Sequence, residues 1–425
     1  MEVYKFGGAS VADAKAIQNM AMLVKNAASA NLLVVISAME KITDQLVALS
    51  QSYIAGDNQQ AVLQLEEVKA YHFQVLNELF PDHNLAVYND IANVFVEIEW
   101  LLEEEASDAP DYIYDQIVSI GELASTKLIT AYLKSIGCNA VWADARNYIK
   151  TDNSYKEAKV DWPKTETEIQ KHLLPQLQKH IVVTQGFIGS TSENFTTTLG
   201  REGSDYSAAI FSACLNARAL TIWKDVPGVL NADPKWFAET EKIPQLSYHD
   251  AIELTYYGAT VIHFKTIKPL QNKGIPLYVR SFIDPAQPGT VITALESHLP
   301  VPSFIFKVNQ VLISIFPKDY SFIIEENLSN IFNLFHKHKV KINTMLNAAL
   351  SFSVSVDQEE SKINALIKDL SEFYKVKYNT GLELVTIRYY NQETINRVIQ
   401  NKQIMLEVKS RYTCQILMKD QPAVE

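Results

Sequence analysis

The sequence contains neither of the two common glycine-rich nucleotide-binding patterns. No Gly-x-x-x-x-Gly-Lys-Ser/Thr and no Gly-x-Gly-x-x-Gly occurs among its 425 residues, so a Walker-type NTPase and a Rossmann dinucleotide fold lose their main support. Cysteine is also scarce, since the chain has only three, far apart and without Cys-x-x-Cys spacing. That scarcity argues against a disulfide framework and a zinc site, and it favours a reducing compartment.

Positive charge and long apolar runs are lacking as well. The chain has 49 acidic and 38 basic residues, a net charge of −11 and no long basic run, so nucleic acid is not an expected partner. The apolar run at residues 32–39 is far too short to span a bilayer, and no signal-peptide pattern opens the chain. We therefore predict a cytoplasmic protein without a membrane partner.

The composition that is present, 47% hydrophobic and 20% charged, is that of a folded protein long enough for more than one domain. Residues 2–6 and 32–37 are predicted strands, and residues 11–30 a helix that Ser10 caps, with Asp13 three residues on. The second strand shows no alternation, as expected in a sheet covered on both faces. Such a parallel βαβ unit binds its ligand at the carboxyl ends of the strands.

The first domain is predicted to be a three-layer αβα sandwich with a mainly parallel sheet, spanning residues 1–295. Many helix formers and no strong strand signals predict a helical insertion at about residues 44–110. Further strands are predicted at residues 140–143, 181–184, 220–223 and 277–279.

Residues 296–302 carry two prolines and are predicted to be a linker to a C-terminal region at 303–425. The pattern βαββαβ over residues 303–380 predicts a ferredoxin-like unit. Its predicted strands are 304–316, 340–346, 349–356 and 376–378, and its helices are 322–336 and 359–373. A second unit over residues 381–425 has a predicted strand at 382–390, a helix at 392–400 and strands near Met405 and Cys414. It then stops short, so we predict that it is incomplete.

Two segments carry the residue types of an anion-binding site, and the first opens the chain. Gly7 and Gly8 stand between a strand and a helix, where N–H groups and the positive helix end attract phosphate. Lys5 just before them adds a full positive charge. For this segment alone, an ordinary βα turn with a surface lysine is the alternative.

The second segment is residues 196–205, in which hydroxyls, glycines and charges gather before a helical pattern. Ser204 is predicted to cap that helix and leave the amides around Gly203 to bind an anion. Arg201 offers a planar fork for a carboxylate or phosphate. The negative charge of Asp205 is tolerable beside a phosphate if it orients lysines or a magnesium ion. The alternative interpretation is that Asp205 only stabilises the start of a helix. Together the two segments indicate phosphoryl transfer.

Two weaker signals complete the candidate site. Glu122 lies in the apolar stretch 118–124 and needs a partner if it is buried, such as a substrate ammonium; a solvent-facing helical position is the alternative. Residues 223–235 predict a strand, turn and loop at the same sheet edge, which could hold a nucleotide. The nine histidines form no metal-spaced cluster, so no metal site is predicted.

In the right order along the chain, several segments resemble the motifs of the aspartate kinases, in the amino-acid kinase superfamily. They are residues 5–10, 185–190, 196–207, 223–234, 257–259 and 288–290. The resemblance covers nearly the whole chain, and the C-terminal region resembles ACT regulatory domains. It implies that a monofunctional enzyme uses ATP with Mg²⁺ to phosphorylate the β-carboxylate of L-aspartate, the first step toward lysine, threonine and methionine. A homodimer through the ACT-like units is expected by analogy.

Carried over by position, the resemblance implies that Lys5 and Asp205 form the phosphoryl-transfer pair. Glu122 corresponds to the residue that takes the ammonium of aspartate, and Arg201 to the one that takes its α-carboxylate. The other implied contacts are Thr43 and Ser204 with the substrate, and Gly7, Gly8, Ser10, Gly203, Lys224, Asp225, Leu230, Lys235, Thr260 and Val261 with the phosphates or the nucleotide.

Several positions depart from the family pattern. Glu202 replaces a glycine, and Lys224, Leu230, Lys235 and Thr260 stand where Thr, Tyr, Arg and Lys are common. Asn343 and Asn347 stand where acidic and serine groups typically hold the effector, so feedback by lysine or threonine is predicted to be weak or absent. Two alternatives stay open: a sibling kinase acting on glutamate, and a nucleotide-degenerate pseudokinase that serves as an amino-acid-binding regulatory subunit.

Overall fold

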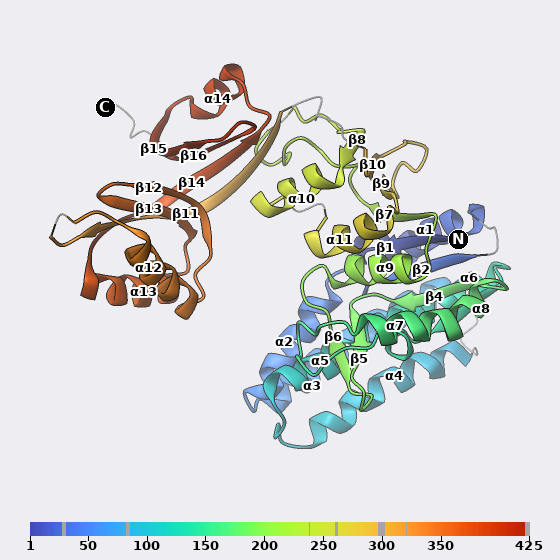
Figure 1. Ribbon diagram of the computed structural model, residues 1–425. Coiled ribbons are helices and arrows are strands. Elements are labelled where there is room, and N and C mark those ends of the chain that lie inside the picture. The colour runs from blue at the N-terminus through green and yellow to red at the C-terminus, as the bar shows by residue number, and fades with distance from the viewer. Residues whose placement is uncertain are drawn as a thin grey trace. The chain divides into compact units, whose positions relative to one another are not determined.

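The structure is a computed structural model that describes residues 1–27, 31–81, 86–237, 239–259, 262–295, 302–319 and 321–420. The chain divides into two units (Figure 1). The first comprises Met1–Val229, Pro244–Ile252 and Val261–His298, and the second comprises Leu230–Ile243, Glu253–Thr260 and Leu299–Glu425. Of the predicted linker, residues 296–301 lie outside the described residues.

The first unit is built on an eight-stranded sheet with the order β3-β4-β2-β1-β7-β9-β10-β8. Neighbouring strands are parallel except for the antiparallel pair β9 and β10. The strands are β1 (Glu2–Phe6), β2 (Leu32–Ile36), β3 (Ala140–Ala143), β4 (Ile181–Gln185), β7 (Ala219–Lys224), β8 (Gln245–Ser247), β9 (Leu277–Ser281) and β10 (Thr290–Thr293). The four strands predicted between residues 140 and 279 are confirmed as β3, β4, β7 and β9.

Helices cover both faces of this sheet, which explains why β2 and β4 are buried along their whole length. Helix α6 packs on β2, β3 and β4, and helix α9 packs on β1, β2 and β7. The helices are α1 (Ala14–Asn26), α2 (Ile42–Ile54), α3 (Asn58–Leu79), α4 (Ala86–Glu103), α5 (Pro110–Val118), α6 (Ile120–Ser135), α7 (Trp162–Glu168), α8 (Leu174–Leu177), α9 (Gly203–Cys214), α10 (Tyr248–Tyr257) and α11 (Phe264–Lys273). The predicted helical insertion is confirmed as α2, α3 and α4.

The prediction that Ser10 caps the first helix was wrong. Gly8–Val11 forms a short 3-10 helix, η1, in which the Ser10 N–H donates to the Gly7 carbonyl at 2.9 Å. Helix α1 begins only at Ala14, and its N-cap is Asp13, whose carboxylate accepts from the Ala16 N–H at 2.7 Å. The turn after β1 therefore takes three more residues than the sequence pattern indicates.

The second unit contains a six-stranded antiparallel sheet with the order β12-β13-β11-β14-β16-β15. Its strands are β11 (Ser303–Pro317), β12 (Ile342–Ala348), β13 (Ser351–Asp357), β14 (Tyr374–Arg388), β15 (Lys402–Lys409) and β16 (Thr413–Asp420). Its C-terminal helices are α12 (Glu325–Lys337), α13 (Glu360–Phe373) and α14 (Gln392–Ile399). Figure 1 shows β11 and β14 as two long neighbouring strands in this sheet.

The prediction of separate strands at residues 376–378 and 382–390 was wrong, because both belong to β14. This strand continues through Gly381, which adopts a left-handed φ of 66° that glycine tolerates. Paired along β11, it serves two ferredoxin-like halves with separate cores. Within the part of the chain that the structure describes, the first half carries α12 and α13, and the second carries α14. The fold class is the predicted one, an α/β sandwich followed by ACT-like units.

Candidate active site

A buried charge cluster lies at the carboxyl ends of β1 and β7. Lys5 of β1 is in register with Ile222 of β7, and Lys224 lies two residues further on, so both lysine side chains lie on the same face of the sheet. Helix α9 packs against β1 and β7 and presents Asp205 from its first turn. Lys5 Nζ lies 2.6 Å from one Asp205 oxygen, and Lys224 Nζ lies 3.4 Å from the other.

The lysines keep Asp205 ionised although it is fully buried. Burial by itself raises the pKa of this carboxyl, but the charges of Lys5 and Lys224 outweigh it and hold the pKa below its ordinary value. For Lys224, burial lowers the pKa, and the charge of Asp205 reverses this and raises it. The cluster therefore holds a buried carboxylate between two lysine side chains.

The glycine turn after β1 lies beside this cluster. A Cβ atom added to Gly7 would be 3.4 Å from Lys5 Nζ, and one added to Gly8 would be 2.8 Å from the Glu40 carbonyl oxygen. A side chain at Gly8 would therefore clash with the turn after β2, and one at Gly7 would contact the lysine. Ser10, 1% exposed, lies in η1, which continues from the turn. The absence of side chains at Gly7 and Gly8 lets the backbone of the turn lie close to Lys5 Nζ.

Glu122 lies in the first turn of α6 and is 2% exposed. Its carboxyl accepts a hydrogen bond from the Ala38 N–H, while its Oε2 has no hydrogen-bond partner among the described residues. Burial raises its pKa to about 8, and Lys5 is near enough to oppose that shift. Thr43, half-buried, lies in the first turn of α2. A buried acid with an unpaired oxygen matches a site for a cation.

The segment before α9 packs closely against the end of β4. Gly186 and Gly203 have no room for a Cβ atom, which would lie 2.5 Å from Ser204 and from Phe187, respectively. The prediction that Ser204 caps α9 was wrong, because the N-cap is Glu202 and Ser204 lies within the first turn. Glu202 adopts a left-handed conformation, with φ 56° and ψ 26°.

The other predicted residues fall into three groups. Arg201 and Asp225 are exposed in the first unit. Leu230 and Lys235 belong to the second unit, where the Lys235 N–H donates to an oxygen of Asp233 at 2.9 Å. The predicted contacts of Thr260 and Val261 lie outside the described residues.

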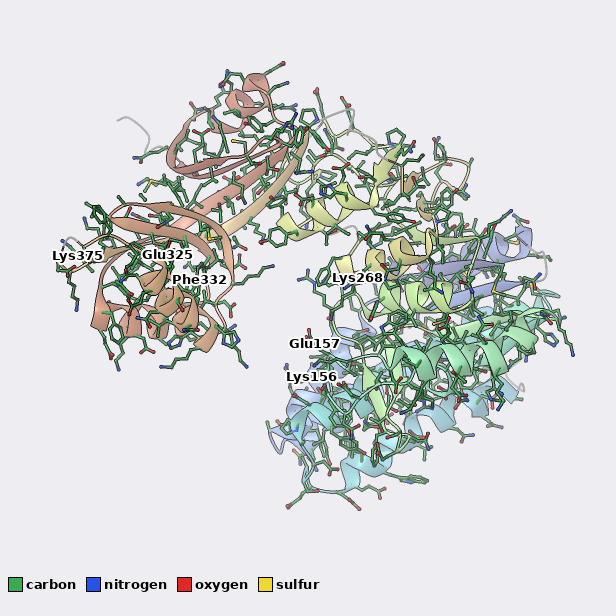
Figure 2. All side chains as sticks on the ribbon, in the orientation of Figure 1. Lys156, Glu157, Lys268, Glu325, Phe332 and Lys375 are labelled. Atoms are coloured by element: carbon green, nitrogen blue, oxygen red, sulfur yellow. The ribbon has the colours of Figure 1, made fainter. Side chains whose placement is uncertain are left out.

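Sequence reasoning missed Asp115, a fully buried carboxylate on α5. It accepts hydrogen bonds from the Thr198 N–H at 2.9 Å, the Thr198 hydroxyl at 2.7 Å and the Lys156 N–H at 3.0 Å. Burial raises its pKa to about 6 against these hydrogen bonds. Asp115 thereby ties the segment with Lys156 and Glu157 (Figure 2) to the hairpin of β5 (Ile188–Ser190) and β6 (Thr196–Thr198), just before Arg201. The sequence signal that could have identified Asp115 as buried is its position between the apolar residues Ile113 and Ile117.

Two searches of the described residues complete the picture. No group of three or more His, Cys, Asp or Glu side chains could hold a metal ion there. No helix in that part of the chain is long and apolar enough to cross a membrane.

The comparisons with known proteins identify the family of this chain. A family model described as "Amino acid kinase family" matches residues 1–281, which is more than half of the chain. The chain therefore belongs to the amino acid kinase family.

Within that family it belongs to the aspartokinases. Lysine-sensitive aspartokinase 3 of Escherichia coli is 31% identical, over 91% of this chain and 86% of that protein. A bifunctional aspartokinase/homoserine dehydrogenase 2 of Zea mays is 34% identical over 68% of this chain. The match covers only 32% of the length of the maize protein. The crystal structure of E. coli aspartokinase III in complex with aspartate and ADP (R-state) superposes with a TM-score of 0.82 at 28% identity, covering 98% of this chain and 96% of that one.

Proposed function

We propose that this chain transfers the γ-phosphoryl group of ATP to the β-carboxylate of L-aspartate, forming 4-phospho-L-aspartate. The observation that carries the proposal is the buried ion pair between Lys5 and Asp205 beside a glycine turn. The aspartokinase relatives and the aspartate and ADP named for the E. coli structure support the choice of substrates. In this role the chain acts at the first step toward lysine, threonine and methionine.

The reaction needs no general base, because a β-carboxylate is already ionised at neutral pH. The obstacle is the approach of two anions, and phosphoryl transfer is catalysed by positioning and positive charge. Lys5 supplies that charge beside the glycine turn, and Asp205 holds the ammonium group in place. Gly7, Gly8, Ser10 and Gly203 are proposed to bind the phosphates.

Glu122 and Arg201 are proposed to recognise the two ends of the amino acid, with Thr43 and Ser204 as further contacts. Glu122 offers a buried oxygen without a partner, which suits the ammonium of aspartate. Arg201 is exposed and has the planar fork that suits an α-carboxylate. Because the pKa of Glu122 is about 8 without ligand, binding of the ammonium is expected to release a proton from it.

Mg²⁺ is expected to accompany the nucleotide, where it would neutralise phosphate charge. Both oxygens of Asp205 already face ammonium groups, and the described residues hold no other cluster for a metal ion. We therefore assign no step to an ion held by the protein alone. Asp225, Leu230, Lys235, Thr260 and Val261 remain predicted nucleotide contacts.

The regulatory predictions remain proposals. We propose residues 1–295 as the catalytic domain and residues 303–425 as the regulatory region, in a cytoplasmic homodimer that pairs through its ACT-like units. Weak or absent feedback by lysine is supported by Asn343, whose amide donates to Gln310 and Asp357 and whose oxygen accepts from Lys307. A submillimolar inhibition constant for lysine or threonine would overturn this part.

The test of the function is ADP release by the purified chain with Mg-ATP and either L-aspartate, L-glutamate or no acceptor. Turnover with aspartate alone is the expected result. Turnover with glutamate would favour the sibling kinase. Folded protein that binds aspartate without turnover of any acceptor would favour the regulatory pseudokinase.

A further inference from the structure

Lys224 lies beside the Lys5–Asp205 pair, although its sequence position belongs to the predicted nucleotide contacts. It ends β7 on the same face of the sheet as Lys5, two residues past the register partner of Lys5. Asp205 stands between the two lysines, with one oxygen 2.6 Å from Lys5 Nζ and the other 3.4 Å from Lys224 Nζ. The Lys224 side chain is only 20% exposed, so it is directed inward to this carboxylate.

The charges around Lys224 do not balance within the protein. Asp205 is one carboxylate shared by two ammonium groups. Glu122 is the other buried acid near the cluster, and its pKa of about 8 leaves it mostly neutral at pH 7. Glu202 and Asp225 also act on Lys224, but Asp225 is exposed and Glu202 is half-buried, so water screens both. Unbalanced charge at a buried position is costly until a counter-ion binds. Because the excess charge here is positive, the matching ligand is an anion.

The position of that anion follows from the glycine turn. The Cβ position of Gly7 is 3.4 Å from Lys5 Nζ, so a phosphate bound at the turn touches Lys5 from one strand and lies next to Lys224 on the neighbouring strand. We infer that Lys224, together with Lys5, binds the phosphoryl group that is being transferred, and not the base, ribose or phosphates that remain in ADP. This inference rests on the proposed function and adds a second cation to its mechanism.

The step requires no proton from either lysine. An oxygen of the aspartate β-carboxylate forms a bond to the γ-phosphorus while the bond from that phosphorus to the bridging oxygen breaks. The electron pair leaves on ADP, and the equatorial phosphoryl oxygens carry the charge throughout. Lys5 and Lys224 donate hydrogen bonds to these oxygens, and Asp205 keeps the two ammonium groups apart and in place.

The experiment compares Lys224→Met and Lys224→Arg with the wild type and with Lys134→Met, which removes an exposed lysine from the last turn of α6. Steady-state kinetics separate kcat from the KM of each substrate. Calorimetry measures the affinity for Mg-ADP, which lacks the transferred group, and for Mg-AMP-PNP, which carries its counterpart. Circular dichroism and thermal unfolding identify any variant that has not folded.

We expect Lys224→Met to lower kcat about 100-fold, as loss of one preorganised donor at developing charge does. Its affinity for Mg-ADP should match that of the wild type, while its affinity for Mg-AMP-PNP falls. Lys224→Arg keeps the charge and should recover part of kcat, and Lys134→Met should behave as the wild type. If Lys224→Met fails to fold, Lys224→Arg still tests the inference. The different geometry of arginine should lower the affinity for Mg-AMP-PNP and leave the affinity for Mg-ADP unchanged.

The result that would overturn the inference is an equal loss of affinity for both nucleotides with kcat retained, because Lys224 would then contact the part of ATP that ADP keeps. A wild-type chain that binds Mg-AMP-PNP without phosphorylating aspartate would instead defeat the proposed function. In that case the two binding measurements on Lys224→Met still decide where Lys224 acts. A wild type that binds neither nucleotide would reject both.

Discussion

Each unit of the chain buries a cluster of polar side chains, and the two clusters differ in how well they are satisfied. In the second unit, Gln310 is fully buried, donates to Asp357 at 2.7 Å, and accepts from Ser355 and Asn343 at 2.9 Å each. In the first unit, two ammonium groups share the single carboxylate of Asp205. The Gln310 cluster finds its hydrogen-bond partners within the protein, whereas the cluster around Asp205 has an excess of positive charge.

This difference separates a structural role from a ligand-binding one. A buried polar group that finds all its partners in the protein fixes the local packing, here where β11 changes register between Lys307 and Leu312. A buried charge or oxygen without a matching partner is tolerated when a ligand completes it. The first unit has both, in its excess ammonium charge and in Glu122 Oε2.

The largest effect should come from breaking the charged cluster at its centre. Lys5→Ala and Asp205→Asn are expected to lower aspartate-dependent kcat by about a thousandfold, since each removes preorganised charge or its positioning from the transfer site. ADP release measured at saturating substrates checks this. Circular dichroism should show that both variants remain folded, and near-normal kcat in a folded variant removes that residue from the mechanism.

Glu122 comes next, because it is expected to bind the substrate and not the phosphoryl group. Glu122→Gln should raise the KM for aspartate about 10- to 100-fold, as expected for loss of a charge-assisted hydrogen bond, with a smaller change in the KM for ATP. Steady-state kinetics with each substrate varied in turn check this. Equal changes in both KM values would show that Glu122 does not distinguish the two substrates.

The raised pKa of Glu122 also predicts a pH dependence of stability. Burial raises this pKa to about 8 in the folded chain, above its unfolded value, so the folded chain holds a proton that the unfolded chain releases. The resulting stabilisation is complete below about pH 4, the unfolded pKa, and is lost as the pH rises through about 8. The free energy of unfolding of the wild type should therefore fall across this range relative to that of Glu122→Gln.

Urea titrations of both proteins from pH 5 to pH 9 measure that difference. Saturating L-aspartate should reduce it, because the ammonium of the ligand takes the place of the proton. Parallel pH profiles of the two proteins without ligand would mean that Glu122 is not held in its neutral form.

A substitution in the hydrogen-bonded cluster around Gln310 should lower the stability of the chain and leave its activity unchanged. Gln310→Ala leaves the buried Ser355 hydroxyl without its acceptor and removes one of the two acceptors of the Asn343 amide, so it should cost about 1–3 kcal/mol in the free energy of unfolding. Its kcat at saturating substrates should equal that of the wild type. Gln403→Ala, at an exposed position on β15, is the matched control and should change neither quantity. A fall in kcat with Gln310→Ala would show that this cluster is coupled to the reaction.

Local patterns in the sequence were enough to predict six of the eight strands of the sheet, all except β8 and β10, and the two segments that carry Lys5 and Asp205. They predicted that the Lys5 segment and residues 223–235 lie at one sheet edge, because carboxyl ends of parallel strands meet there. The position of Lys224 next to Lys5 depends on the register between β1 and β7, which are more than 200 residues apart in the sequence. No local pattern specifies that register.

The wrong predictions have similar causes. Ser10 and Ser204 have the residue type of a helix cap, but the turn before each helix determines which residue takes that position, and here it is Asp13 and Glu202. The two strands predicted within β14 lie on either side of Gly381, whose left-handed φ of 66° is common in turns. Pairing along β11 carries the strand through that glycine, and this partner cannot be identified from the β14 segment alone.

The smallest predicted effect concerns the backbone that holds the charged cluster. Glu202 is the N-cap of α9 in a left-handed conformation, which disfavours residues other than glycine by about 1 kcal/mol. Glu202→Gly should therefore raise the free energy of unfolding by about that amount, as measured by urea denaturation. Glu202→Ala is the control, because it removes the same charge near Lys224 and keeps the strain, so it should not be stabilised. If the free energy of unfolding rises equally in both variants, the charge of Glu202 and not its backbone conformation destabilises the wild type. The negative charge of Glu202 near Lys224 would then not stabilise the fold.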